Sequence, residues 1–382
     1  MAKEIGDIIT AYHEAQRAGR KTALATVVHV EGSSYRMPGA RMLVEDNGKM
    51  TGAISGGCLE GDALKKALHA INQHSNKLVT YNTLDEDDVA FGVQLGCNGI
   101  VHILFEPIDP GQANNPVALL ERFFCRRQNA VLVTMYSLAN PTGLQPGTCF
   151  FMDEDIPVSA IEDTGLAPTI SIDAKETLAT GLSLLRDYPG YELSAFYELL
   201  RPTVSLVIVG AGNDALPLAE MAKVLGWSIT IIDGRVTHAN TSRFPKAGKI
   251  IVGKPAEVLS QVVVDERTVF VLLTHNYNYD LAMMKILLET KSKYIGTLGP
   301  KKRLKRLMAE LEGQGVITTD EQNKTIYGPT GLDIGAETPE EIALSIVAEI
   351  KAVLAGHPGT SLRLRSTAIH SRPSHNFLPN IP

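Results

Sequence analysis

A cysteine, Cys58, stands where a strand-like run meets the start of a helical pattern, in the stretch ISGGCLEGD. Gly56 and Gly57 precede it, and backbone N–H groups in such a glycine turn at a helix N-terminus attract anions and favour a thiolate. Glu60 and Asp62 carry negative charge and oppose that preference. The position therefore predicts either a reactive or ligand-binding sulfur beside an anion site, or a small residue buried in a tight turn.

Cys97 occupies a second glycine-rich stretch, LGCNG, directly before another predicted strand. Two cysteines in such loops could meet in space, and a buried residue in a tight turn is again the alternative. Cys125 and Cys149 lie in helix-like and strand-like surroundings and are expected to pack in the interior. No pair of cysteines or histidines has the sequence spacing of a zinc site, and no Ser-His-Asp or HExxH pattern occurs.

The most legible motif is a glycine loop between two strand-like runs, SLVIVGAGNDALPLAEMAKVLGWSITIID. Gly210 would form the tight turn, Gly212 would let backbone N–H groups approach a pyrophosphate, and Ala215 would let the helix pack on the strand. Asn213 lies in the same loop, at a helix N-terminus that favours anions. Asp233 ends the second strand, where an acid can accept hydrogen bonds from ribose hydroxyls. The segment predicts a Rossmann-like unit that binds a nucleotide or a similar phosphate.

Two further polar clusters follow strand-like runs, at the edge where parallel sheets bind ligands. His275 and Asp280 come after VFVLLT, and a histidine near an acid can transfer protons or bind a metal. Asp280 could instead cap the next helix. Lys301 and Arg303 lie in the first turn of another predicted helix. Cations there oppose the helix dipole, which favours an anion site, with a solvated basic surface as the alternative.

The composition is that of an ordinary globular protein, with 382 residues, 44% apolar and 20% charged. The net charge of −6 favours neither nucleic acid nor an anionic membrane as a partner. No run of about 18 apolar residues predicts a membrane span, and the first residues resemble an amphipathic helix rather than a signal peptide. With four widely spaced cysteines, we expect a cytoplasmic protein with reduced thiols.

The predicted fold is α/β, with an N-terminal mixed α/β domain followed by a Rossmann-like parallel-sheet domain. The expected boundaries are 1–200 for the first domain with its connector, 201–355 for the second, and 356–382 for an extended or disordered tail. In the first domain Asn47-Gly48 predicts a β-hairpin, and we expect a helix that ends near residues 197–200. In the second, Thr338 begins a predicted capping box.

Taken together, the motifs resemble the XdhC/CoxI family, the xanthine dehydrogenase accessory proteins. The resemblance extends from about residue 5 to about residue 355 and leaves out the tail. The motifs that carry it are GSSYRMPGARM (32–42), GAISGGCLEGD (52–62), GCNGI (96–100), GAGNDALPLAEMAKVLGW (210–227), IIDGR (231–235), LTHNYNYD (273–280), YIGTLGPKKR (294–303) and GPTGLDIGAETPEEIALSI (328–346).

The resemblance implies an accessory protein or chaperone, rather than a dehydrogenase. Such a protein binds molybdenum cofactor (molybdopterin) and protects it while its terminal sulfido ligand is installed. It then helps to insert the cofactor into the apoenzyme of a xanthine-dehydrogenase-type molybdenum hydroxylase. By this resemblance Cys58 is the best candidate to contact molybdenum or a transferred sulfur, and Cys97 is a second candidate. The other matching positions are Gly210, Gly212, His275 and Asp280.

Two other functions stay open on the residues alone. An NAD(P)-dependent oxidoreductase would bind its cofactor at the glycine loop, with Asp233 favouring NAD and His275 as general acid. A persulfide carrier would accept sulfur on Cys58 from a cysteine desulfurase without binding a pterin. A homodimer is a further hypothesis, because apolar residues of the tail could pack on a second copy.

Overall fold

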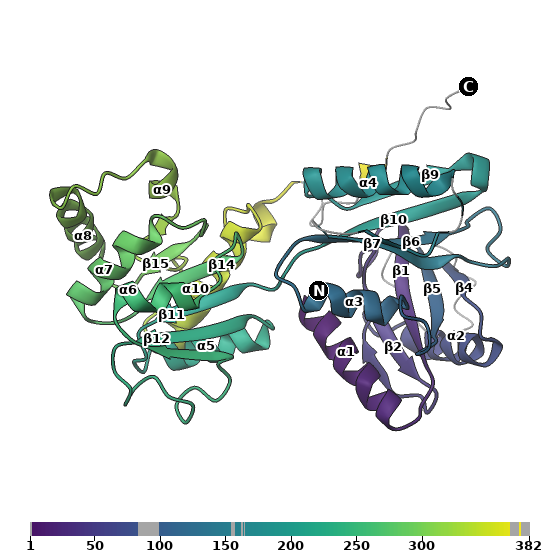
Figure 1. Ribbon diagram of the computed structural model, residues 1–382, viewed down its shortest axis with the longest axis horizontal. Helices are drawn as coiled ribbons and strands as arrows, with labels where there is room; N and C mark the ends of the chain where they lie inside the picture. Colours follow the sequence, from purple (N-terminus) through teal and green to yellow (C-terminus); the bar gives the residue numbers. More distant parts are fainter. Residues whose placement is uncertain are drawn as a thin grey trace. The chain divides into compact units, whose positions relative to one another are not determined.

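The computed structural model divides into two compact units, one of residues 1–202 with 370–382 and the other of residues 203–369 (Figure 1). The described residues are 2–82, 99–153, 157–161, 163 and 165–366, together with the backbone of 374 and 375. Among them, no helix combines the length and the apolar character that crossing a membrane requires.

The first sheet of the first unit has the strand order β3-β2-β1-β5-β4, and its neighbouring strands are antiparallel. Its strands are β1 (Thr22–Gly32), β2 (Arg41–Glu45), β3 (Met50–Gly52), β4 (Lys77–Asn82) and β5 (Gly99–Ile108). The turn from β2 to β3 contains Asn47-Gly48, and Gly48 has a φ of +88°. The predicted hairpin is therefore confirmed, because this turn needs a residue that tolerates positive φ.

The second sheet has the order β17-β9-β10-β6-β7-β8. Its strands are β6 (Ala130–Tyr136), β7 (Gly147–Met152), β8 (Val158–Ser159), β9 (Leu184–Tyr188), β10 (Leu193–Leu200) and β17 (Ser374–His375). β17 runs parallel to β9, and the other neighbouring strands are antiparallel.

The expectation of a helix ending near residues 197–200 is wrong, because these residues belong to β10. This strand lies between β9 and β6 and is buried on both faces, so its sequence LSAFYELL lacks the alternation of a half-buried strand. A short, continuous apolar run of this kind fits a buried strand or a buried helix equally well. Its pairing with β9 and β6 identifies this segment as a strand rather than a helix.

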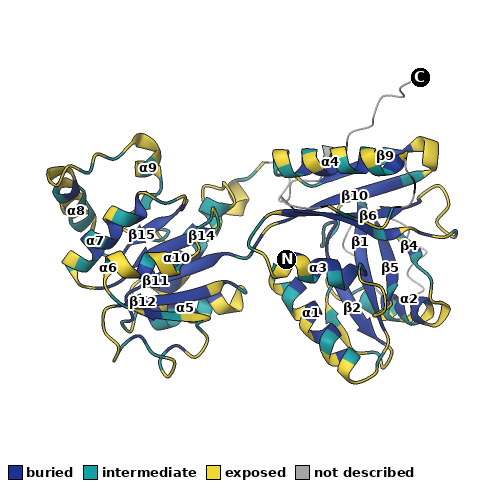
Figure 2. Cartoon of the chain, in the orientation of Figure 1, coloured by how far each residue is buried: buried dark blue, intermediate teal, exposed yellow. Residues whose placement is uncertain are grey.

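The helices of the first unit cover and join the two sheets. They are α1 (Ala2–Arg17), α2 (Glu60–Gln73), α3 (Pro116–Phe124), α4 (Leu166–Thr180) and the short η2 (Pro189–Tyr191). α2 packs on one face of the first sheet, and α4 packs on the second sheet. α1 and α3 share a core with strands of both sheets, and a small apolar cluster lies between the sheets themselves. Figure 2 shows the buried strands and the exposed outer faces of the helices.

The second unit contains one six-stranded parallel sheet with the order β13-β12-β11-β14-β15-β16. Its strands are β11 (Ser205–Val209), β12 (Ser228–Asp233), β13 (Lys249–Val252), β14 (Thr268–Leu272), β15 (Ile295–Thr297) and β16 (Ile326–Tyr327). Counted from β11, this is the order 3-2-1-4-5-6 of a Rossmann fold. The predicted fold class is therefore confirmed.

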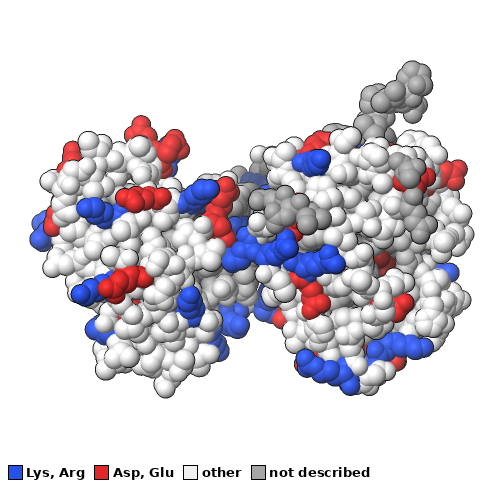
Figure 3. All heavy atoms as spheres, viewed as in Figure 1, with Lys and Arg blue, Asp and Glu red and all other residues white. Residues whose placement is uncertain are grey.

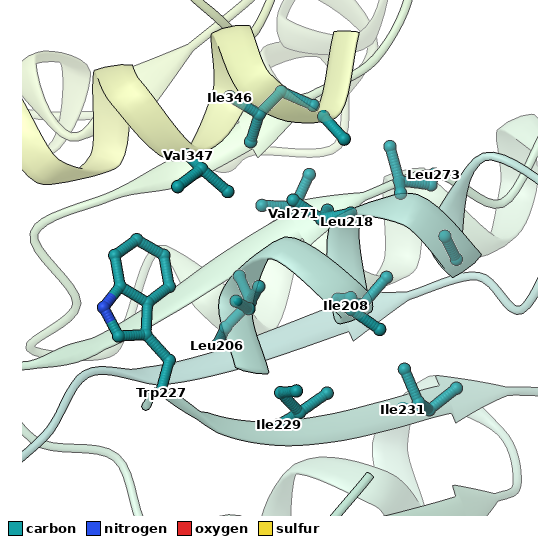
Figure 4. Close-up of a cluster of buried hydrophobic side chains, with 14 of the residues drawn as sticks. Leu206, Ile208, Leu218, Trp227, Ile229, Ile231, Val271, Leu273, Ile346 and Val347 are labelled. Atoms are coloured by element: carbon teal, nitrogen blue, oxygen red, sulfur yellow. The ribbon is translucent and has the colours of Figure 1, made fainter. Parts of the chain in front are cut away.

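Helices cover both faces of this parallel sheet. They are α5 (Ala215–Val224), α6 (Pro255–Val258), α7 (Tyr277–Leu287), α8 (Lys301–Gly313), α9 (Asp320–Lys324), α10 (Pro339–Leu354), η3 (Leu259–Gln261) and η4 (Leu362–Leu364). α5 and α10 pack on one face, where Leu218, Ile346 and Val347 meet the apolar side chains of β11, β12 and β14 (Figure 4). α6, α7 and α8 pack on the other face.

The hydrogen bonds at the start of α10 agree with the capping box predicted from the sequence. Thr338 Oγ1 accepts a hydrogen bond of 3.3 Å from the Glu341 amide, and Glu341 Oε2 accepts one of 3.0 Å from the Thr338 amide, so the predicted capping box is confirmed.

Figure 3 shows Lys and Arg side chains interspersed with Asp and Glu on both units. This mixture agrees with the small net charge.

Candidate functional site

The order of the parallel sheet creates a switch point between β11 and β14. The sheet continues through β12 and β13 on one side and through β15 and β16 on the other, so the chain leaves β11 and β14 in opposite directions. Ligands of such sheets bind outside the carboxyl ends of the strands at this point. The loop with Gly210 follows β11 and His275 follows β14, so the sheet brings both predicted site residues to this edge.

Gly210 and Gly212 meet different requirements in the glycine loop. Gly210 has a φ of +117°, and a Cβ there would lie 2.6 Å from the carbonyl carbon of Leu273 and 2.8 Å from the amide nitrogen of Thr274. Only glycine fits this position, because both the conformation and the space exclude a side chain. Among the described residues, a Cβ at Gly212 would approach only the ring of His275, at 4.0 Å, so there is open space beside the loop.

Three consecutive amides at the end of this loop are available to a ligand. Within the described part of the chain, the N–H groups of Gly212, Asn213 and Asp214 make no hydrogen bond, whereas those of Gly210 and Ala211 bind β12. The three amides precede α5, and amides at a helix N-terminus attract anions. The loop therefore has the donors that a phosphate would need.

The carboxylate of Asp233, at the end of β12, is occupied by its own chain. Oδ2 accepts a hydrogen bond of 2.7 Å from the Ala211 amide, and the guanidinium of Arg235 donates to Oδ1 at 2.9 Å and to Oδ2 at 2.8 Å. Burial would raise the pKa of Asp233, but these hydrogen bonds and the charge of Arg235 outweigh it and lower the pKa. A ribose hydroxyl would have to share or displace these partners, so ribose recognition by Asp233 stays a prediction.

Arg243 is a cation beside the glycine loop that the motifs did not single out. Its Nη2 donates a hydrogen bond of 3.0 Å to Asn213 Oδ1 and one of 3.4 Å to the Ala211 carbonyl. Its Nε is buried and has no hydrogen-bond partner among the described residues. Arg243 lies in the connection that follows β12. A basic residue after the carboxyl end of a strand is the feature of the sequence from which this ligand-binding candidate could have been predicted.

His275 lies at the rim of the switch point with a side chain that is 69% exposed. It has a φ of +46°, and its Nε2 lies 3.4 Å from Oδ2 of Asp214, directly before α5. A histidine in this place can move a proton or contact a ligand of the glycine loop. This contact joins His275 to Asp214, whereas Asp280, the acid that the sequence placed beside it, bonds Thr274 and Arg303.

Asp280 is buried and faces Thr274 and Arg303. Its Oδ1 accepts a hydrogen bond of 2.5 Å from Thr274 Oγ1, and its Oδ2 accepts one of 2.5 Å from Arg303 Nη2. Burial raises the pKa of Asp280 even though the Thr274 bond and the Arg303 charge oppose the rise. Asp280 does not cap α7, because Asn276 does so. Arg303 therefore has an internal counter-ion, whereas Lys301 is exposed at the start of α8.

In the first unit, Cys58 is half-buried just before α2, with its Sγ 3.5 Å from Ser55 Oγ. The amides of Gly57 and Leu59 each donate to Ser55 Oγ at 3.1 Å, and Ser55 donates to the Glu60 carboxylate. Burial would raise the pKa of Glu60, but the hydrogen bonds from Ser55 outweigh it and lower the pKa. Ser55 thus accepts the hydrogen bonds of two amides of the turn. The glycine turn was predicted to attract an external anion, and in the structure the carboxylate of Glu60 supplies a negative charge beside it.

The two glycines before Cys58 shape this turn. Gly57 has a φ of +111°, a conformation that side chains disfavour. A Cβ at Gly56 would lie 3.5 Å from the ring of Tyr35, whose side chain is largely exposed. The turn is therefore a local structure that glycine permits, close to the surface.

The remaining cysteines differ in their surroundings. Cys97, the second predicted candidate, lies outside the described residues. Cys149 is buried as expected, and burial together with the charge of Glu106 raises its pKa to about 12, so it stays a thiol. The expectation of a packed Cys125 is wrong, because this residue ends α3 and is exposed.

Two parts of the chain match known protein families. Residues 206–350 match the XdhC Rossmann domain, and residues 15–82 match the XdhC and CoxI family. The first match contains the glycine loop, Arg243 and His275. The second contains β1 to β4 and the turn with Cys58.

Similar proteins extend over nearly the whole chain. A protein of Bacillus subtilis, named as a probable xanthine dehydrogenase subunit, is 32% identical over 330 residues, which are 86% of this chain and 92% of that protein. The molybdenum cofactor insertion chaperone PaoD of Escherichia coli is 24% identical over 340 residues, 89% of this chain and 86% of PaoD. A crystal structure of a xanthine dehydrogenase from Bacillus halodurans has a TM-score of 0.74 at 29% identity and covers 93% of this chain and 98% of its own.

Proposed function

The chain belongs to the XdhC and CoxI family, and from this membership we propose that it is an accessory protein for molybdenum enzymes. In this proposal it binds molybdenum cofactor and assists its insertion into a molybdenum hydroxylase of the xanthine dehydrogenase type. The observation that carries the proposal is the alignment of 89% of the chain, across both units, with a molybdenum cofactor insertion chaperone. The Bacillus subtilis relative, whose name refers to xanthine dehydrogenase, points to the class of enzyme served.

Molybdenum cofactor is the cargo here, and the second unit has groups that fit its phosphate. The amides of Gly212, Asn213 and Asp214 make no hydrogen bond within the described residues and stand before α5. Arg243 adds a positive charge beside them, and hydrogen bonds between a guanidinium and a phosphate are strong. The open space at Gly212 lets a bulky group approach the backbone. These residues would hold the phosphate, while Asp214 would hold His275 at the rim.

Cys58 supports the sulfur-related part of the proposal. A half-buried thiol in a glycine turn can contact molybdenum or a transferred sulfur atom, both of which are soft partners for sulfur. We therefore propose that the protein protects the cofactor while the terminal sulfido ligand is installed, with a cysteine desulfurase as the source of sulfur.

Co-expression of a xanthine-dehydrogenase-type hydroxylase with and without this protein tests the proposal. We expect the hydroxylase from cells that contain the protein to carry more molybdenum and more sulfurated cofactor, and to be more active. Elemental analysis measures the molybdenum, and pterin fluorescence measures the organic part of the cofactor. Equal cofactor content and equal activity in both preparations would contradict the proposal.

An NAD(P)-dependent oxidoreductase is the second candidate that the Rossmann fold permits. The hydrogen bonds of Asp233 count against it, because both carboxylate oxygens already serve Ala211 and Arg235 instead of a ribose. Purified protein that shifts NADH fluorescence and oxidises NADH would favour the oxidoreductase. Protein that carries molybdenum and pterin but leaves NADH unchanged would favour the accessory role.

A further inference from the structure

Two histidines and a glutamate come together on β1 and β5 in the first unit. The strands are antiparallel, and their register shifts between Val27 and His29, after which His29 lies directly opposite His102. Glu31 is two residues further along β1, so its side chain lies on the same face as that of His29. A bulge re-aims the side chains that follow it, and here it gathers three side chains of metal-binding type on one face of the sheet.

The three side chains are close enough to share one ion. His102 Nε2 lies 3.2 Å from Glu31 Oε1, and His29 Nε2 lies 3.9 Å from the same oxygen. One ligand atom from each residue lies within 4.8 Å of the other two. Around a tetrahedral ion with bonds of about 2.0–2.2 Å, ligand atoms are roughly 3.3 Å apart. The separations of 3.2 and 3.9 Å from Glu31 Oε1 are already near this value, and side-chain movements that shorten the 4.8 Å limit by about 1.5 Å would close the site.

His102 has a partner that can orient it for metal binding. Thr80 Oγ1 on β4 lies 2.9 Å from His102 Nδ1. When Nδ1 carries the proton and donates a hydrogen bond to Thr80 Oγ1, Nε2 presents its lone pair toward Glu31, which is the arrangement of metal-binding histidines.

We propose that His29, Glu31 and His102 bind one divalent transition-metal ion of the Zn²⁺ type. Two imidazoles and one carboxylate are ligands that Zn²⁺ prefers, and three protein ligands leave a fourth position for water or another ligand. Both histidines are buried, while the exposed Glu31 provides a path by which the ion enters.

This site is distinct from the turn that contains Cys58. Val30 and Val101 pack with Cys58 in the core beneath α2, and neighbouring residues along a strand point to opposite faces. The three proposed ligands therefore point away from Cys58, toward the side on which Leu104 packs against the second sheet. The metal site does not depend on the proposed role in molybdenum cofactor insertion.

Zn²⁺ titration of the full-length protein, stripped of metal with a chelator, tests the proposal by isothermal calorimetry. We expect Glu31→Gln and His102→Gln each to weaken Zn²⁺ binding at least about tenfold, since each removes one ligand. Thr80→Val should weaken binding roughly tenfold while leaving all three ligands in place, because it removes the group that orients His102. His69→Gln, an exposed histidine on α2, is the matched control and should bind like the unaltered protein.

Glu31→Gln keeps the test valid if the buried His102 variant fails to fold, since Glu31 is exposed. The absorption spectrum of bound Co²⁺ reports directly on the ligands, and its d–d bands should be lost in the Glu31 and His102 variants. Unaltered protein that binds no Zn²⁺ overturns the proposal. Binding that is equal in unaltered protein, Glu31→Gln and His69→Gln also overturns it, because the ion would then lie elsewhere.

Discussion

Arg303 in α8 donates a hydrogen bond of 2.5 Å to the buried carboxylate of Asp280 in α7. Thr274, just after β14, donates to the other oxygen of the same carboxylate. These bonds tie the beginnings of two helices to the edge of the parallel sheet where His275 and the glycine loop lie. The arrangement stabilises the second unit and gives the cation of α8 an internal partner.

Removal of Arg303 should destabilise the second unit in a pH-dependent way. We expect Arg303→Met to lower the free energy of unfolding by about 2 kcal/mol at neutral pH, because a buried carboxylate loses its cation. Burial already raises the pKa of Asp280, so around this pKa the folded unit binds more protons than the unfolded chain. The stability of the unit therefore falls as pH rises from the pKa of Asp280 in the unfolded chain to its pKa in the folded unit. Without Arg303 this pKa rises further, so the loss should shrink at mildly acidic pH.

Urea unfolding followed by circular dichroism at both pH values measures this effect. Lys302→Met, at the exposed neighbouring position, is the control and should leave the midpoint unchanged. An Arg303→Met loss that is the same at both pH values would show that Asp280 is not the group involved.

The two glycines of the loop should respond differently to alanine. Gly210→Ala should destabilise the second unit by about 2 kcal/mol or more, because its Cβ would collide with the backbone of Leu273 at a φ that alanine disfavours. Gly212→Ala should keep the unfolding midpoint near that of the unaltered protein and reduce the molybdenum and pterin retained on purification. Thermal unfolding and elemental analysis separate the two effects, and equal destabilisation by both variants would contradict this account.

Arg243 should contribute to cofactor binding through its charge. We expect Arg243→Met to weaken the binding of molybdenum cofactor roughly 10- to 100-fold, the usual cost of a hydrogen bond to a charged group. Lys246→Met is the control, since Lys246 lies in the same connection but pairs with the exposed Glu220. Pterin fluorescence of the purified variants measures bound cofactor. Equal losses in both variants would assign the effect to general surface charge.

Cys58 should matter for cofactor sulfuration and little for stability. Cys58→Ala removes one half-buried sulfur, so we expect a nearly unchanged unfolding midpoint but loss of the increase in active, sulfurated hydroxylase during co-expression. Cys125→Ala, which removes an exposed thiol, should keep that increase.

Mass spectrometry after incubation with a cysteine desulfurase also tests the persulfide carrier. A persulfide on Cys58 in protein that never binds pterin would favour the carrier over the chaperone.

The turn at Cys58 should show an acid-dependent stability that comes from Glu60. Because the folded-state pKa of Glu60 is lowered, its contribution is complete above the unfolded pKa and is lost as pH falls through the folded pKa. Ser55→Ala removes the hydroxyl that binds Glu60 and two amides, so we expect a loss of about 1 kcal/mol at neutral pH. In acid, the difference between the unfolding midpoints of the variant and the unaltered protein should shrink to the part that the two amides contribute, and a difference that does not change with pH would argue against Glu60.

Much of the fold could be predicted because its signals are local. The Asn47-Gly48 turn and the Thr338 capping box depend on interactions within a few residues, and the Gly210 loop has a local sequence pattern; each occurs as predicted. The order of strands and helices from residue 203 onward likewise indicated a parallel sheet. The identity of β10 was missed, because a short apolar run has no local signal that separates strand from helix.

By itself, the sequence determined the fold class, the family and the glycine loop, because these follow from residue types at short spacing. Tertiary structure alone decided which side chains meet. Arg303 is 23 residues from Asp280, Arg243 is 30 from Asn213, and His102 is 71 from Glu31. Such pairs depend on strand order, and at His29 on a one-residue bulge that decides which face of the sheet a side chain occupies. The sequence spacing of these residues does not reveal which face of the sheet a side chain occupies, because the pairing of the strands determines it.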